Sequence, residues 1–334
     1  MSKKPIQEQE IIQLLKIYYG INAQSAQLIS GGADFNAFAY KSDAKDNSNS
    51  YFVKFKYGDH DDIGLSIISI LHDSGIKELI VPINTLEGKS SQLSDRFRII
   101  VYPFIHAPNG FTQNLTEKQW KQLGTALRST HEITVPALIQ NQLRKESYST
   151  QWREMVRSFY SRIEPDSSDD KITADFKAFF KQNSAQIHRL VDSTEELSKK
   201  IHPDPEHYVL CHSDVHAGNI LVANDDSIYI IDWDEPMMGP KERDLMFIGG
   251  GVGHVWNKHQ EIEYFYEGYG TTDIDKTMLS YYRHERIVED LALYGADLLA
   301  QDQSDESRME MLQYFIEMFN PNDVIEIAFA TKPI

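Results

Sequence analysis

The first third of the chain contains short segments in which apolar and polar residues alternate, with turn-forming residues between them. The runs AQLIS, NAFAY and YFVKFKY are separated by GGAD and KSDAKDNSNS, which predicts antiparallel strands joined by turns. A helix predicted over residues 61–73 follows, and then two more strand-like runs, ELIVPI and FRIIVYPFI. Ahead of the strands, an apolar stripe over 5–19 that stops at Gly20 predicts an opening helix.

After about residue 107 the apolar residues recur at helical spacing. Thr116 and Gln119 have the spacing of a capping box ahead of WKQLGTALRSTH. Long amphipathic patterns recur near residues 150–163, 172–200 and 276–300. Strand-like runs return only around residues 209–222 and 228–232.

This change of pattern predicts an α+β fold with two lobes. Residues 1–105 are expected to form a small lobe built on a five-stranded antiparallel sheet plus helices. Residues 102–109 are expected to connect it to a larger, mainly helical lobe over 110–334.

Composition and charge narrow the class of protein. The 334 residues carry a formal net charge of -17, which argues against a nucleic-acid surface and favours a cationic small molecule, although charge also serves solubility. No apolar run has the length of a signal peptide core or a membrane span, and Cys211 is the only cysteine. We therefore expect a cytoplasmic protein without disulfides, membrane contact or an obligate protein partner.

The stretch VLCHSDVHAGNILV carries the residues with the clearest chemistry. Asp214 and Asn219 lie five residues apart, and Asp232 follows Asp214 by 18 residues at the end of IYIID. Phosphoryl transfer needs one carboxylate facing the attacking hydroxyl, and an amide oxygen and a second carboxylate that hold Mg²⁺ against the nucleotide phosphates. The spacing therefore predicts Asp214 as the catalytic residue and Asn219 and Asp232 as ligands of the metal.

Two other interpretations of this stretch remain open. His212, Asp214 and Asn219 are also residue types that satisfy turn amides in ordinary loops. His212, Asp214 and His216 alternate as zinc ligands often do, but a zinc site would leave Asn219 and Asp232 without a purpose.

A phosphotransferase also needs a lysine on a central strand to hold the phosphates of its nucleotide. YFVKFKY offers Lys54 and Lys56 on one face of a strand, and the pattern aromatic-Val-Lys favours Lys54, although both can belong to a solvated face. Gly31 and Gly32 lie in a turn where bare backbone can approach phosphate, or in a plain hairpin.

The remaining binding residues are expected around the connector and after the metal aspartate. Main-chain groups from Tyr102 to Phe104 are predicted to pair with a purine edge. Carboxylates beside aromatic faces suit an ammonium-bearing acceptor, and Glu285, Glu289 and Asp290 lie together on a later helix. The residues predicted to contact the acceptor are Asp234, Glu235, Trp256 and Tyr294.

The motifs HSDVHAGNILV, IDWDEP, YFVKFK and YPFIHAPNGF resemble those of the aminoglycoside phosphotransferase family, whose fold is similar to that of protein kinases. The flanking text, including YYRHERIVEDLALYG, resembles the bacterial spectinomycin phosphotransferases, which modify a 9-hydroxyl. The resemblance covers nearly the whole chain. It implies ATP as donor, with GTP open, Mg²⁺ as cofactor, and transfer of the γ-phosphate to a cationic aminocyclitol or amino sugar, giving antibiotic inactivation. It also implies that His212 braces the loop and that Asp244 has a structural role.

The chain departs from the family pattern at one position. The family usually pairs the strand lysine with a glutamate on the next helix, but this sequence has Gly64 there. Asp61 and Asp62 are the nearest acids, and either can pair with Lys54 or lie at the helix N-terminus, where carboxylates are favoured.

Other functions compatible with these motifs use a different acceptor or have weak catalytic activity. Only 12 residues separate Asp232 from Asp244, too few for the activation segment of a protein kinase, so a small acceptor is expected. Choline, homoserine or a sugar would use the same motif chemistry. A catalytically weak nucleotide-binding regulator is the remaining alternative, favoured only by the missing helix glutamate.

Overall fold

The computed structural model describes residues 6–29, 35–40, 50–57, 63–94, 97–164, 170–250, 252–300 and 303–331. The chain divides into two compact units. Unit 1 comprises Met1–Gln119, Ile133–Leu143 and Gly218–Pro236. Unit 2 comprises Trp120–Glu132, Arg144–Ala217 and Met237–Ile334. Unit 1 thus includes Asn219 and Asp232, through its segment Gly218–Pro236, in addition to the N-terminal residues.

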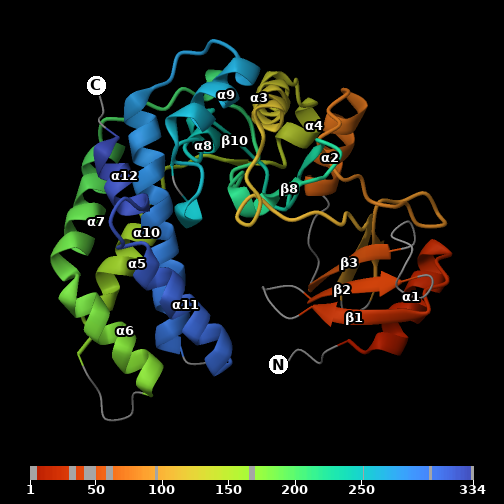
Figure 1. Ribbon diagram of the computed structural model, residues 1–334, viewed down its shortest axis with the longest axis horizontal. Helices are drawn as coiled ribbons and strands as arrows, with labels where there is room; N and C mark the ends of the chain where they lie inside the picture. The colour runs from red at the N-terminus through yellow and green to blue at the C-terminus, as the bar shows by residue number, and fades with distance from the viewer. Residues whose placement is uncertain are drawn as a thin grey trace. The chain divides into compact units, whose positions relative to one another are not determined.

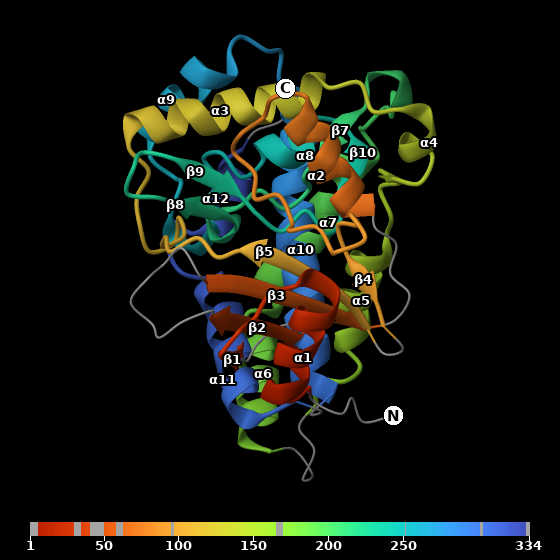
Figure 2. The ribbon, with the colours of Figure 1, turned by 90° about the vertical axis from the view of Figure 1, so that its right-hand side faces the viewer.

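Unit 1 is built on a five-stranded antiparallel sheet, as the sequence predicts (Figure 2). Its strand order is β1-β2-β3-β5-β4. The strands are β1 (Ser25–Ile29), β2 (Phe35–Tyr40), β3 (Ser50–Tyr57), β4 (Gln92–Leu93) and β5 (Phe97–Pro103).

Helix α1 (Glu8–Tyr19) packs its apolar stripe against this sheet. Ile11, Leu15 and Tyr19 share one buried core with the inward-facing strand residues, and the Tyr19 hydroxyl donates to the Ile99 carbonyl at 2.7 Å. Gly20 ends the helix in the left-handed region at φ 67°, where glycine has no steric cost. The predicted opening helix is thereby confirmed from Glu8 onward.

The prediction of a strand over ELIVPI is wrong in the described structure. That segment makes one isolated bridge, Leu79 to Ile230, and donates from the Ile83 amide to the Val101 carbonyl at 2.7 Å. Pro82 supplies no amide for a ladder, which disfavours a paired strand there. The fifth strand is instead the short β4.

A hairpin of β8 (Ile220–Val222) and β9 (Ile228–Ile230) completes the part of unit 1 that matters for the site. The amides of Ile230 and Val222 donate to the carbonyls of Glu78 and Pro108, both at 2.8 Å. Helix α2 (Ile63–Asp73) and the short α4 (Ala137–Gln140) belong to the same unit. The hairpin therefore carries Asn219 before its first strand and Asp232 after its second.

Unit 2 is mainly helical and is organised around the 25-residue helix α10 (Figure 1). Its inward face, including Ile287, Val288 and Leu291, forms one apolar core with residues of the surrounding helices. Helix α10 spans Lys276–Ala300, and the helices around it are α5 (Gln151–Phe159), α6 (Lys171–Gln182), α7 (Ser184–Ser198), α11 (Asp305–Glu317) and α12 (Val324–Ala330).

A small three-stranded sheet in unit 2 leads into the catalytic stretch. Its order is β6-β10-β7, formed by β6 (Arg144–Lys145), β10 (Met237–Gly239) and β7 (Val209–Cys211). The remaining helices are α3 (Glu117–Glu132), α8 (Glu242–Leu245) and α9 (His259–Tyr269). The capping box before α3 is confirmed, since the Gln119 amide donates to Thr116 Oγ1 at 3.3 Å and the Thr116 amide to Gln119 Oε1 at 3.0 Å. No helix within the described ranges is both long enough and apolar enough to cross a membrane.

Candidate active site

Two lysines and two aspartates form a charged cluster in unit 1. Lys54 Nζ lies 3.0 Å from Asp232 Oδ1 and also pairs with Asp234, whose second oxygen is 2.9 Å from Lys56 Nζ. Burial alone would lower the pKa of Lys54, but the two carboxylates outweigh it and raise that pKa. Burial likewise raises the pKa of Asp234, and Lys54 and Lys56 reverse the sign and lower it. Lys54 and Asp234 are therefore charged at neutral pH.

Asp232 is held in an unusual backbone conformation. Its φ of 65° lies in the left-handed region, which non-glycine residues occupy at a cost and often at functional sites. The residues on both sides are anchored: the Ile231 amide donates to the Asn219 carbonyl at 2.9 Å, and Trp233 Nε1 donates to the Ile230 carbonyl at 3.1 Å. The hairpin thus brings the two predicted metal ligands, Asn219 and Asp232, to its open end.

The structure explains the glycine that replaces the family's helix glutamate. A Cβ atom added at Gly64 would overlap the Trp233 carbonyl oxygen, so any side chain there would push α2 away from the loop after β9. Lys54 is paired by Asp232 and Asp234, which compensates for the missing helix carboxylate. Asp61 and Asp62, the alternatives from the sequence, lie outside the described residues.

The other predicted nucleotide residues have different outcomes. Gly31 and Gly32 lie outside the described part of the chain. Tyr102 pairs with Phe52 at the end of β5, and the Phe104 amide donates to the Ser50 carbonyl at 3.1 Å. Because that amide is engaged in the sheet, a purine contact from this segment must come from its other main-chain groups.

In unit 2 the backbone of the loop after β7, which carries Asp214, is fixed by Asp244, a fully buried residue of α8. Its two oxygens accept the amides of His212 at 2.9 Å and Ser213 at 2.7 Å, and one also lies 3.0 Å from His131 Nε2. Burial raises the pKa of Asp244, but His131 and the loop groups outweigh it and lower the pKa. The Asp214 amide in turn donates to His212 Nδ1 at 3.2 Å, so His212 braces the loop from within.

The carboxylate of Asp214 lies beside an arginine and a histidine. Arg286 from α10 pairs with Oδ1, and His216 Nε2 lies 3.5 Å from Oδ2. The side chain remains 40% exposed. Burial would raise the pKa of Asp214, but Arg286 and His216 more than offset it, and the pKa lies well below the usual range of aspartates. Asp214 is therefore ionised throughout the physiological pH range and is a weak base.

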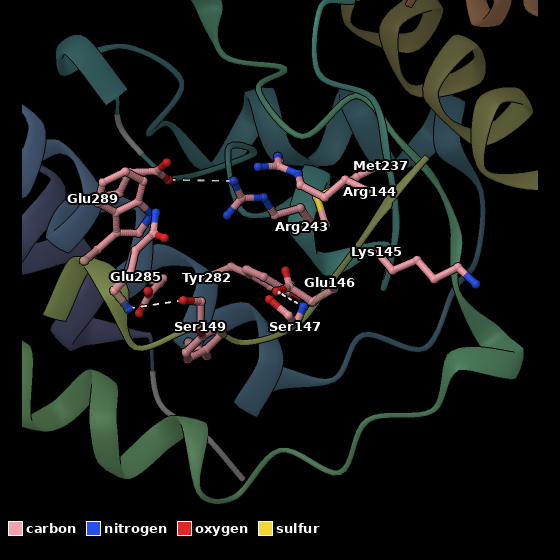
Figure 3. A pocket seen from close by; sticks show the side chains of 13 residues that line it. Arg144, Lys145, Glu146, Ser147, Ser149, Met237, Arg243, Tyr282, Glu285 and Glu289 are labelled. Carbon is pink, nitrogen blue, oxygen red and sulfur yellow. Dashed lines mark hydrogen bonds and ion pairs between the residues drawn. The ribbon is translucent and has the colours of Figure 1, made fainter. Parts of the chain in front are cut away.

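A cavity of about 250 Å³ lies within unit 2, lined by residues of α10 and of the segment after β6 (Figure 3). Glu285 and Glu289 point into it from successive turns of α10, and Arg243 lies 3.8 Å from Glu289. Glu285 is only 5% exposed, and burial raises its pKa to about 7 despite Arg153 at 3.6 Å. Within the described chain Glu285 Oε2 has no hydrogen-bond partner. The cavity can therefore supply carboxylates to a positively charged ligand.

The residues predicted to contact the acceptor do not line this cavity. Asp234 is paired with lysines in unit 1, where Glu235 is exposed. Trp256 is buried against Trp120 with ring centroids 5.0 Å apart. Tyr294 packs near Tyr314 at the edge of the helical core. The aromatic lining comes instead from Trp152, Tyr281 and Tyr282.

Sequence reasoning found part of this cavity and missed the rest. Helical spacing placed Glu285 and Glu289 together, and the same spacing would have added Tyr282 on that face. Arg243, which lines the cavity, and Arg286, which pairs with Asp214, reach their partners only through the fold. Neither arginine carries a local sequence signal.

The zinc interpretation of His212, Asp214 and His216 finds no support in the geometry, because His212 Nδ1 accepts the Asp214 main-chain amide and His216 pairs with the Asp214 carboxylate. A different trio within the described ranges, His131, Cys211 and Asp244, has atoms within 4.8 Å of one another. The oxygens of Asp244 already accept hydrogen bonds, and burial raises the pKa of the Cys211 thiol well above its ordinary value. That trio is a packed hydrogen-bonded cluster.

Comparisons with known proteins agree with this geometry. The model of the phosphotransferase enzyme family matches residues 25–279. The structure of spectinomycin phosphotransferase, APH(9)-Ia, in complex with ADP and spectinomycin is 66% identical over 98% of this chain and 99% of that one, with a TM-score of 0.93. Its AMP-bound complex is 66% identical over 98% and 100%, with a TM-score of 0.90. No curated protein matches the chain.

A distant similarity shows the fold alone. An amicoumacin kinase in complex with AMP-PNP and Ca²⁺ is 14% identical over 96% of this chain and 95% of that one, with a TM-score of 0.63. The sheet-containing unit and the helical unit therefore belong to the kinase-like fold that the sequence predicted.

Proposed function

The chain belongs to the phosphotransferase enzyme family, and from this premise we propose that it transfers the γ-phosphoryl group of ATP to a hydroxyl group of spectinomycin and so inactivates the antibiotic. The observation that carries the proposal is 66% identity, over 98% of the chain, to a phosphotransferase bound to ADP and spectinomycin. The predicted catalytic and metal residues Asp214, Asn219 and Asp232 are all present.

Asp214 is proposed to orient the acceptor hydroxyl and to receive its proton late in the transfer. The transition state of phosphoryl transfer is loose in most analyses, so the nucleophile needs little activation before the bond to phosphorus forms. A carboxylate whose pKa is held low by Arg286 and His216 fits that demand, because it stays ionised and accepts a hydrogen bond from the hydroxyl. Direct in-line transfer then requires no phosphoenzyme.

The donors around the β8–β9 hairpin fit Mg²⁺. Asp232 offers carboxylate oxygens and Asn219 an amide oxygen, which are the hard ligands that this ion prefers. The main chains of the two residues are linked by the hydrogen bond from Ile231 to Asn219 at 2.9 Å. Asn219 and Asp232 would hold the ion, and the ion would neutralise negative charge on the nucleotide phosphates.

Lys54 is proposed to contact those phosphates. Its ammonium group already binds two anionic groups, Asp232 and Asp234, and a phosphate oxygen is an equivalent partner. Lys56 holds Asp234 from the other side at 2.9 Å, which leaves Asp234 paired when Lys54 turns to a nucleotide. In this proposal Asp234 forms ion pairs with Lys54 and Lys56, whereas the sequence led us to expect that it contacts the acceptor.

The acceptor is proposed to use the cavity of unit 2. Its ammonium groups would meet the carboxylates of Glu285 and Glu289 beside the ring of Tyr282, a combination that suits a cationic aminocyclitol. Both carboxylates lie on α10 within a turn of Arg286, which contacts Asp214. The two carboxylates of the cavity and the arginine that pairs with Asp214 therefore lie on the same part of one helix. The proposal retains the cytoplasmic location expected from a chain with a single cysteine.

The test is nucleotide turnover by the purified protein with Mg²⁺ and ATP or GTP, against spectinomycin, aminoglycosides, choline and homoserine. We expect turnover with spectinomycin and ATP that disappears when Mg²⁺ is chelated. Asp214→Asn should lower kcat by about 10²–10⁴-fold and leave nucleotide affinity within a few-fold. Turnover with choline alone would overturn the acceptor, and near-normal kcat in Asp214→Asn would overturn the role of Asp214.

A further inference from the structure

Arg286 occupies a central position beside the catalytic carboxylate. Its guanidinium pairs with Asp214 Oδ1 through Nη1, and its Nε lies 3.1 and 3.2 Å from the two oxygens of Asp290, one turn further along α10. The guanidinium carbon is also 5.7 Å from the centre of the Phe247 ring. The side chain is 21% exposed. The guanidinium of Arg286 is thus held by Asp290 and lies near the Phe247 ring, in addition to its pairing with Asp214.

The main chain and the side chain of Asp214 are fixed by different groups. Asp244 holds the loop through the amides of His212 and Ser213, but those bonds do not determine how the carboxylate turns about its last torsion. That torsion is broad in aspartate, so backbone position alone leaves the carboxylate plane undefined. A planar guanidinium anchored by a second carboxylate presents its N–H groups in fixed directions and selects one plane.

We propose that Arg286 is a positioning residue for phosphoryl transfer, which sets the orientation of the Asp214 carboxylate toward the acceptor hydroxyl and is itself aimed by Asp290. The inference rests on the function proposed above and extends it to residues on α10. Asp290 is included in the proposal because it holds the Arg286 guanidinium at 3.1 Å.

The charges around this group agree with the proposal. Asp214, Asp290 and Glu289 place three carboxylates near one another, and Arg286 interacts favourably with all three. Burial lowers the pKa of Arg286, but these carboxylates reverse the effect and raise it, so the guanidinium remains charged. Replacing it with a neutral side chain would expose Asp214 to the repulsion of its acidic neighbours and would remove one of the two side chains that hold its carboxylate, the other being His216.

Arg283 supplies a matched control one turn earlier on α10. Its Nε and Nη2 donate to the carbonyls of Met246 at 3.1 Å and Ile248 at 2.7 Å, and its Nη1 donates to Thr331 Oγ1 at 2.7 Å. It is therefore an arginine on the same helix whose guanidinium is engaged by two main-chain carbonyls and by Thr331.

The experiment compares wild type, Arg286→Gln, Arg286→Lys and Arg283→Gln. For Arg286→Gln we expect kcat with spectinomycin to fall by about 10²-fold, the size of effect expected from misplacing a reacting group, with nucleotide Kd within twofold. Guanidinium added to the assay should raise the kcat of Arg286→Gln at least tenfold. Arg286→Lys should retain a higher kcat than Arg286→Gln. Arg283→Gln should lower thermal stability without any guanidinium-dependent gain in rate. Unchanged kcat in Arg286→Gln, or a loss that guanidinium does not relieve, would overturn the proposal.

A second measurement needs no acceptor. Crystal structures of the same proteins should show one orientation of the Asp214 carboxylate in wild type and Arg283→Gln, and a rotated or divided carboxylate in Arg286→Gln. An identical orientation in all three would overturn the positioning role even if no acceptor is turned over. Lack of wild-type turnover across the panel, with the carboxylate rotated in Arg286→Gln, would count against the proposed function and support the positioning contact.

Discussion

Replacement of Glu285 by glutamine should change how the stability of the protein depends on pH. The pKa of Glu285 is raised to about 7 in the folded protein, chiefly by burial, against 4.5 for the free side chain. Below pH 4.5 both folded and unfolded chains hold the proton. Between pH 4.5 and 7 the unfolded chain loses it first, so the wild type becomes less stable relative to its unfolded state as pH rises.

The expected size follows from the two pKa values. They differ by about 2.5, and each pKa unit corresponds to about 1.4 kcal/mol, so ionisation of Glu285 lowers the free energy of unfolding by about 3 kcal/mol. Glu285→Gln keeps the shape of the side chain and cannot ionise. Its stability relative to wild type should therefore be about 3 kcal/mol more favourable at pH 8 than at pH 4.5.

Urea denaturation at both pH values measures this difference. Glu285→Leu is the companion variant: it changes packing and the contact with Arg153 at 3.6 Å, but it removes the same titration. Relative to wild type, both variants should gain the same free energy of unfolding between pH 4.5 and pH 8. The free energies of unfolding of the two variants should differ by the same amount at both pH values. A difference between wild type and Glu285→Gln that is the same at pH 4.5 and pH 8 would refute the reasoning.

Three further predictions concern the described contacts. Gly64→Ala should lower the free energy of unfolding by about 1–3 kcal/mol, because its Cβ would meet the Trp233 carbonyl oxygen, whereas alanine elsewhere in a helix stabilises; equal or higher stability in urea denaturation would contradict this. Asp244→Asn should lower stability by about 3 kcal/mol or more and also reduce kcat, since it disturbs a fully buried charge that holds two loop amides; unchanged kcat would contradict its bracing role. Lys54→Met should raise the KM for ATP at least tenfold and Lys56→Met less, because Lys54 pairs with both carboxylates of the cluster and Lys56 with one; equal effects would count against the assignment.

The elements with strong local patterns could be predicted from the sequence. The stripe of α1 ending at Gly20, the alternation of β1 to β3 and the capping box before α3 each have a cause within a few residues. The run ELIVPI shows the limit of that approach. Its apolar content is typical of a strand, but Pro82 and the course of the chain leave it with one isolated bridge, while the two-residue β4 has no detectable pattern.

The site divides in the same way. Asp214, Asn219 and Asp232 could be proposed because their spacing along the chain matches the demands of the chemistry. Arg286 lies 72 residues after Asp214, and Lys54 lies 178 residues before Asp232, so these pairings depend on tertiary structure. The acceptor contacts stay predictions, and the burial of Trp256 against Trp120 could not be foreseen because the two residues lie far apart in the sequence.

Because Cys211 is buried, the reactivity of its thiol reports local unfolding of β7. The thiol is fully buried in β7, directly before the catalytic loop, and no other cysteine competes with it. A thiol reagent added to the native enzyme can modify it only in molecules in which that strand has separated, so the labelling rate follows local unfolding next to the loop without any engineered probe. A cysteine introduced on an exposed helix would then accept a fluorophore selectively, with the native thiol protected by the fold.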